Sequence, residues 1–275
     1  MIAIFEFLQL REKAKAYLRW EEPRPRWPSL VALLRKYLHW SRTTQFDAEL
    51  RYDIALRYLS ERSHRSAPVN RILDAGSGPH GFARYAGREC VGLDLAFPRD
   101  RIPDDGGQMR RVVGSMTHLP FRERSFDLVL SFDTLEHLPP SQRPAAVREL
   151  FRVASKALVI GVPYGTEAAA HDRWAAAIER ARGDEPDWRR EHVSNGLPGP
   201  ELDQLIASSA VVRNAVWFRV RNHESLLGLK LRWLIGRRIS QSHPAYGLVL
   251  GPLFALSKRL HFGACYRRAY FAEFV

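Results

Sequence analysis

Two acidic residues and three glycines stand at spacings that suit the binding of a nucleoside. Asp74 ends an apolar run and is followed by Gly76, Gly78 and Gly81, while Asp94 ends a second apolar run twenty positions later. Glycine permits backbone angles that other residues avoid and lets a ligand approach the main chain. A carboxylate at the end of the second strand can accept hydrogen bonds from both hydroxyls of a ribose. The pattern therefore predicts a nucleoside-cofactor site.

The identity of the cofactor depends on Asp74. The glycines also satisfy G-x-G-x-x-G, so a dinucleotide is an alternative ligand. The Asp74 carboxylate argues against it, because it would repel a pyrophosphate beside the turn and would suit an ammonium group. Asp-x-Gly-x-Gly over residues 74–78 resembles motif I of the class I S-adenosylmethionine-dependent methyltransferases, and in particular their UbiE-like branch. A glycine turn closing an ordinary βα unit, with Asp74 as a helix cap, is a purely structural alternative.

The resemblance implies that S-adenosylmethionine is the cofactor. Asp74 would orient the methionine ammonium through water or the loop backbone, and Asp94 falls where the ribose-binding acid of this family falls. Asp133 would lie near the reacting end. The cofactor-binding residues implied by the resemblance are Asp74, Gly76, Ser77, Gly78, Asp94, Leu95, Ser115, Met116 and Asp133.

Residues 114–131 extend the resemblance. Gly-Ser-Met-Thr-His-Leu-Pro-Phe and Ser-Phe-Asp-Leu-Val-Leu-Ser are similar to the methyltransferase segment in which Gly-Asp-Ala precedes Leu-Pro-Phe and Phe-Asp-Leu-Val. Ser115 replaces the acid that usually contacts adenine. Its hydroxyl can still pair with the adenine amino group, but hydrogen bonds to a neutral group are weaker than those to a carboxylate. The departure concerns adenine recognition and leaves the predicted fold unchanged.

Two histidines are candidates for a proton-accepting base. His137 follows the predicted strand 126–132 beside Glu136, and in open α/β sheets the carboxyl ends of strands border the ligand cleft. His192 lies in a Glu-His…Gly-Leu-Pro segment over 191–198 that looks like a methyltransferase subgroup of surface-glycan and lipid-linked pathways. A neutral imidazole can accept a hydroxyl proton near pH 7. The alternative role for each histidine is to fix its loop by hydrogen bonding.

The fold expected from the resemblance is α/β: a Rossmann-like, doubly wound sheet of seven strands, mostly parallel, with an antiparallel last strand. Strand six is predicted over residues 211–220. We expect a helical N-terminal extension over 1–44, which covers the cleft as a lid or contacts a membrane. The methyltransferase domain would then occupy 45–275, with a helical insertion over about 223–262.

Composition restricts the partners only in part. The net charge is +12, from 42 Lys and Arg against 30 Asp and Glu, which favours anionic partners or gives a solvated basic surface. Basic amphipathic helices near both ends, with the first over residues 1–19, could meet lipid headgroups or pack over the cleft. No secretory signal is present, and no apolar stretch reaches the roughly 18 residues of a membrane span. We therefore expect a cytoplasmic protein that does not cross a membrane, with contact at its inner face left open.

The predicted function is S-adenosylmethionine-dependent O-methylation of a glycan, a lipid-linked intermediate or another small metabolite. The reaction demands no metal, and the two cysteines form no metal-ligand pattern. One alternative is an NAD- or nucleotide-sugar-dependent oxidoreductase; another is a non-catalytic or RNA-binding module. Asp-Thr-Leu-Glu over 133–136 stands where amino-nitrogen methylating enzymes typically carry Asn/Asp-Pro-Pro-Tyr/Phe, which disfavours nucleic acid as the partner. The sequence specifies neither the acceptor nor the oligomeric state.

Overall fold

The computed structural model describes residues 46–63, 68–79, 81–98, 108–236 and 263–275. The strands are β1 (Ile72–Ala75), β2 (Cys90–Asp94), β3 (Met109–Val113), β4 (Phe126–Phe132), β5 (Ala154–Pro163), β6 (Trp217–Ser225) and β7 (Cys265–Glu273). The helices are α3 (Phe46–Ser63), α4 (Ala83–Ala86), the 3-10 turn η2 (Leu135–His137), α5 (Arg143–Val153), α6 (Gly165–Arg182), α7 (Asp187–Asn195), α8 (Pro200–Val212) and α9 (Leu226–Gly236).

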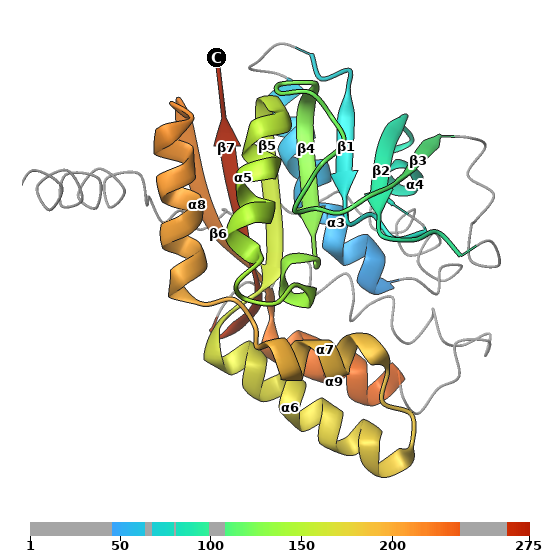
Figure 1. The fold of residues 1–275 in the computed structure, drawn as a ribbon. Coiled ribbons are helices and arrows are strands. Elements are labelled where there is room, and N and C mark those ends of the chain that lie inside the picture. Colours follow the sequence, from blue (N-terminus) through green and yellow to red (C-terminus); the bar gives the residue numbers. More distant parts are fainter. Residues whose placement is uncertain (1–45, 64–67, 80, 99–107, 237–262) are drawn as a thin grey trace, which may run out of the picture.

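The strands form one sheet in the order β3-β2-β1-β4-β5-β7-β6 (Figure 1). The first five pair in parallel, and β7 runs antiparallel to both of its neighbours. All seven residues of β4 are buried, which explains why its sequence is nearly continuous in apolar residues. The predicted seven-stranded, mostly parallel sheet with an antiparallel last strand is confirmed.

Helices cover both faces of the sheet, as the alternation of side chains along β4 requires. Val129 packs into a core shared with α5 and α8, whereas Leu128 and Leu130 pack into a second core shared with α3 and α4. Successive residues of a strand point to opposite faces, so one strand serves both cores. The sheet is held between the two cores, and the carboxyl ends of its parallel strands lie at the same edge.

Helices α6, α7 and α9 lie together beyond those carboxyl ends (Figure 1). The segment of α7 was not recognised as helical from the sequence, because residues 187–195 are mostly polar and show no apolar period. Pro186 precedes the helix and Gly196, at φ +71°, follows it. Proline near a helix start and glycine just past its end are typical boundaries. The helix brings His192 over the end of the sheet.

The prediction of strand six over residues 211–220 is wrong in its first half. Helix α8 continues to Val212, the chain turns at Asn214 with φ +52°, and β6 begins at Trp217. Val212 and Val216 are 75% and 59% exposed. These exposed β-branched residues resemble a strand in sequence although they belong to a helix end and a turn.

Several predicted elements lie outside the described residues: the helices of the 1–44 extension and most of the insertion before the last strand. Within that insertion, β6 continues to Ser225 and helix α9 begins at Leu226. In the part of the chain that the structure describes, no helix combines the length and apolarity needed to cross a membrane.

Candidate active site

The glycine turn after β1 has two positions with different requirements. The backbone N–H groups of Gly76 and Ser77 donate to the carbonyl oxygen of Leu93, at 2.7 and 3.1 Å, which ties the turn to β2. At Gly76, with φ +79°, a Cβ atom would lie 2.2 Å from the side chain of Thr134. At Gly78, with φ +60°, it would meet nothing within 4 Å. Gly76 is therefore needed for packing, whereas Gly78 leaves open space on the cavity side.

Alanine at these two glycines should have separable effects. Gly76→Ala should destabilise the fold by about 2–5 kcal/mol, because it adds a steric clash of about 1–3 kcal/mol to a left-handed backbone that costs about 1–2 kcal/mol. Gly78→Ala should cost about 1–2 kcal/mol for the backbone alone and should lower cofactor affinity, because its methyl group enters the cavity. Chemical denaturation and calorimetry with S-adenosylhomocysteine measure the two quantities. Equal losses of stability in the two variants would contradict the packing role of Gly76.

Asp94 is placed as predicted, beside the glycine turn and at the wall of a cavity. Its Oδ2 accepts a hydrogen bond from the N–H of Gly78 at 2.8 Å, and its Oδ1 accepts one from the N–H of Leu95 at 2.7 Å. A carboxylate has about four acceptor positions, so two remain for ligand hydroxyls. The side chain of Leu95 is 70% exposed and lines the same cavity. An apolar surface beside a hydroxyl-binding acid suits a nucleoside.

Asp74 and Ser77 do not line the cavity, which corrects their expected place in the site. Asp74 is fully buried; its Oδ2 accepts hydrogen bonds from the Tyr52 hydroxyl and the Phe82 N–H, both at 2.8 Å. The hydroxyl of Ser77 donates to the carbonyl of Gly78. Asp74 therefore acts on the turn from behind, and its repulsion of a pyrophosphate is weaker than the sequence suggested.

Replacing Asp74 with asparagine should flatten the pH dependence of stability. Burial, first of all, raises the pKa of Asp74 from 3.8 to about 6, so the folded chain keeps a proton that the unfolded chain releases. The stabilisation is complete below about pH 4 and is lost as the pH rises towards about 6. The change amounts to about 3 kcal/mol, at about 1.4 kcal/mol per pKa unit. Thermal unfolding from pH 4 to 7 measures it, and parallel profiles for parent and variant would contradict the assignment.

A cavity of about 810 Å³ lies at the carboxyl ends of the parallel strands. The other predicted site residues all line it: Gly76, Gly78, Asp94, Leu95, Ser115, Met116, Asp133, His137 and His192. The opposite wall comes from α6, α7, α9 and β7, and sequence reasoning missed its members Trp188, Trp233, Tyr266 and Arg267. Only the folded chain brings these segments together with motif I.

Asp133 sits at the end of β4 in a strained backbone conformation, with φ +48°. Its carboxylate forms an ion pair with Arg267 of β7 at 2.6 Å and with Arg51 of α3 at 3.3 Å. Burial alone would raise the pKa of Asp133, but the charges of Arg267 and Arg51 hold it well below its usual range. Neither arginine was predicted from the sequence. The cavity thus has an ionised acid with two cationic partners at its base.

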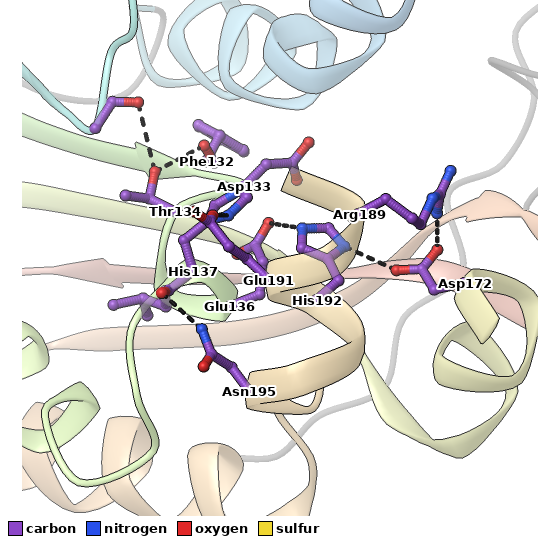
Figure 2. A network of polar contacts seen from close by, with 12 residues as sticks. Phe132, Asp133, Thr134, Glu136, His137, Asp172, Arg189, Glu191, His192 and Asn195 are labelled. Carbon is purple, nitrogen blue, oxygen red and sulfur yellow. Dashed lines mark hydrogen bonds and ion pairs between the residues drawn. The ribbon is translucent and has the colours of Figure 1, made fainter. Parts of the chain in front are cut away.

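His192 is oriented by a buried carboxylate. Its Nδ1 lies 2.7 Å from Asp172 Oδ2, and Asp172 is also held by Arg189 and by the hydroxyl of Tyr266 at 3.0 Å. Figure 2 shows the imidazole between the carboxylates of Asp172 and Glu136. An Nδ1–H that donates to Asp172 leaves Nε2 as a proton acceptor. That Nε2 has no hydrogen-bond partner among the described residues.

His137 and Glu136 complete the histidine side of the cavity. The Nδ1 of His137 lies 2.6 Å from Glu191 Oε2, and its ring centroid is 4.8 Å from that of His192. Burial lowers the pKa of His137. Glu136 is fully buried, and burial together with the charge of Asp133 raises its pKa well above the usual range. The arrangement places two imidazole rings beside the buried carboxyl of Glu136, whose ionised form is strongly disfavoured.

Comparison with known proteins relates this cavity to an enzyme family. Residues 73–158 match the family described as a methyltransferase domain. Norajmaline N-methyltransferase of Rauvolfia serpentina is 28% identical over 144 residues, which are 48% of this chain and 47% of the relative. Tocopherol O-methyltransferase (chloroplastic) of Arabidopsis thaliana is 30% identical over 98 residues, 32% of this chain and 28% of the relative. The chain therefore spans about half the length, or less, of these curated relatives.

A solved structure extends the likeness in fold to nearly the whole chain. The plantazolicin methyltransferase BpumL, in complex with SAH, superposes with a TM-score of 0.54 over 90% of each chain, at 13% identity. The family match begins within β1 and ends within β5, so it contains the glycine turn, Asp94 and Glu136. Residues 73–158 are thus similar to a methyltransferase domain, and the seven-stranded sheet has the same fold as the solved methyltransferase structure.

Proposed function

We propose that this chain is an S-adenosylmethionine-dependent methyltransferase that methylates an oxygen of a small molecule, a glycan or a lipid-linked intermediate. One observation carries the proposal: a single cavity has the glycine turn and Asp94 on one wall and two carboxylate-held imidazoles on the other. The wall with the glycine turn and Asp94 suits a nucleoside. The wall with the two imidazoles suits a hydroxyl group that must lose its proton. The oxidoreductase alternative is not favoured, because the family match and the relatives are methyltransferases.

The residues that line the cavity fit this cofactor. About 810 Å³ lies within the range of small-molecule and cofactor sites, roughly 300–1,000 Å³. Asp94 would accept hydrogen bonds from the ribose hydroxyls, and the open side of Gly78 would admit the amino-acid part. Ser115 and Met116 would flank the adenine. When bound, S-adenosylmethionine supplies a methyl group already activated by a positive sulfur.

An oxygen acceptor must lose its proton, and the histidine wall can receive it. His192 lines the cavity, and an Nδ1–H that donates to Asp172 would leave its Nε2 atom as the proton acceptor. The Nε2 of His137 offers a second acceptor at the more exposed rim. The residues of this chain therefore orient the hydroxyl, hold its proton and exclude water, which is what transfer of an activated methyl group requires.

The cofactor assignment is tested by binding and does not require a known acceptor. The purified full chain should bind S-adenosylhomocysteine in calorimetry with one site per chain, and should bind NAD far more weakly. Mass spectrometry of the freshly purified protein should detect either S-adenosylmethionine or S-adenosylhomocysteine. Tighter binding of NAD than of S-adenosylhomocysteine would overturn the proposal. Contact of residues 1–44 with a membrane stays a separate prediction, measured by liposome co-sedimentation.

A further inference from the structure

Three side chains converge beside the cavity in a way that hydrogen bonding does not explain. Glu136 and His137 come from η2 and His192 comes from α7, and one potential ligand atom of each lies within 4.8 Å of the others. Among the residues that the structure describes, neither carboxylate oxygen of Glu136 has a hydrogen-bond partner, and the ion-pair contact is His192 Nε2 at 3.7 Å. Burying a polar group without a partner is costly. The cluster therefore lacks a component that would satisfy these atoms.

The two imidazoles are held as metal ligands usually are. In metal sites the ring nitrogen that does not face the ion commonly donates to a carboxylate, which fixes tautomer and orientation. Here Nδ1 of His137 lies 2.6 Å from Glu191, and Nδ1 of His192 lies 2.7 Å from Asp172. Both Nε2 atoms are thereby left for another partner. Asp172 is itself anchored by its contacts with Arg189 and Tyr266.

We propose that Glu136, His137 and His192 bind a divalent first-row transition-metal ion. Two imidazole nitrogens and one carboxylate oxygen suit zinc, manganese or iron(II) better than magnesium or calcium, which prefer oxygen ligands. Metal–ligand bonds of about 2.0–2.2 Å set ligand atoms about 3–3.5 Å apart, so ligand atoms already within 4.8 Å of one another need to close by at most about 1.3–1.8 Å. The double positive charge would compensate the buried carboxylate.

The position of the cluster gives the ion a use. His137 and His192 line the cavity and Glu136 lies behind them, so the open coordination positions face the space opposite the glycine turn. An acceptor hydroxyl bound there would lose its proton more readily than in water. This use rests on the proposed function, whereas the binding site itself does not. In the metal-loaded protein the Nε2 atoms of His137 and His192 are ligands and no longer proton acceptors, so the proton of the metal-bound hydroxyl would pass to water.

The test is metal binding by the full chain, prepared without a polyhistidine tag, stripped with a chelator and dialysed. Titration with Zn²⁺ should show one tight site per chain in calorimetry, and Co²⁺ should give visible d–d absorption bands. Glu136→Gln, His137→Gln and His192→Asn should each weaken binding by more than about 100-fold. Asp172→Asn, which removes only the support of His192, should weaken it by about 10–100-fold.

His171→Asn is the matched control. His171 is another buried histidine at the cavity wall that lies outside the cluster, so this variant should bind the ion as the parent does. Circular dichroism checks the fold of every variant. Absence of binding at micromolar Zn²⁺, or binding that all three ligand variants leave unchanged, would overturn the metal site. S-adenosylhomocysteine titrated into the stripped protein reports separately on the proposed function, so the two failures are distinguishable.

Discussion

Replacing Asp94 with alanine should reduce the affinity for S-adenosylhomocysteine by about 10²–10⁴-fold. Hydrogen bonds to a charged group contribute about 1.5–3 kcal/mol each, and the carboxylate has acceptor positions for two ribose hydroxyls. The loss is increased because the carboxylate also accepts from the N–H groups of Gly78 and Leu95, which shape the glycine turn. Calorimetry on the folded variant measures it.

Asp127→Ala provides the matched control for this prediction. Asp127 also accepts two backbone N–H bonds, from Asn70 and Arg71, at 2.8 and 3.1 Å, but it does not line the cavity. Its removal should cost stability and leave the affinity for S-adenosylhomocysteine unchanged. Equal affinities for the Asp94 variant and the parent would remove the basis of the cofactor site.

Replacing Glu136 with glutamine should change stability in opposite directions with and without metal. Without metal the variant should be more stable by about 1–3 kcal/mol, because glutamine removes a buried carboxylate that has no hydrogen-bond partner among the described residues and lies near the charge of Asp133. With Zn²⁺ at 1,000 times its dissociation constant, the parent should gain about 4.1 kcal/mol and the variant little. The order of the two proteins should therefore reverse.

The stabilities of the parent and of Glu136→Gln are compared by thermal unfolding, once in the presence of a chelator and once in the presence of Zn²⁺. Glu149→Gln is a suitable control, because Glu149 pairs with Arg152 and accepts from the N–H of Leu119, away from the cluster. It should lose about the same stability in both conditions. A Glu136→Gln variant that is destabilised in chelator would show that the carboxylate has a structural role and would count against the metal site.

Sequence reasoning predicted what is encoded locally. The turn at Gly76 and Gly78, the acid at Asp94 and the apolar strand 126–132 each lie within a few residues, and each falls where it was expected. Local order does not determine the direction of a side chain, however. Asp74 stands at the predicted end of β1 but points away from the cavity towards Tyr52.

The parts that were missed depend on contacts between distant segments. The partner of Asp133 is Arg267, 134 residues later, and the partner of His192 is Asp172 on a different helix. Glu136 and His192 are separated by more than fifty positions, so their spacing resembled no metal motif. The members of these pairs come together only in the folded chain, in which α6 and α7 lie beyond the carboxyl ends of the strands. Polar residues such as those of α7 give no periodic signal that would indicate this placement in advance.

The strand order has a consequence for how the chain is completed during synthesis. Among the strands that the structure describes, β7 is made after β6, yet it lies between β5 and β6 and supplies Arg267 to Asp133. Until the ribosome has released residues 265–273, β6 has no neighbour and the acid at the end of β4 lacks one of its cations. A nascent chain can therefore assemble the parallel half of the sheet early, but the β6 edge and the ion pair between Asp133 and Arg267 can form only after β7 has been made.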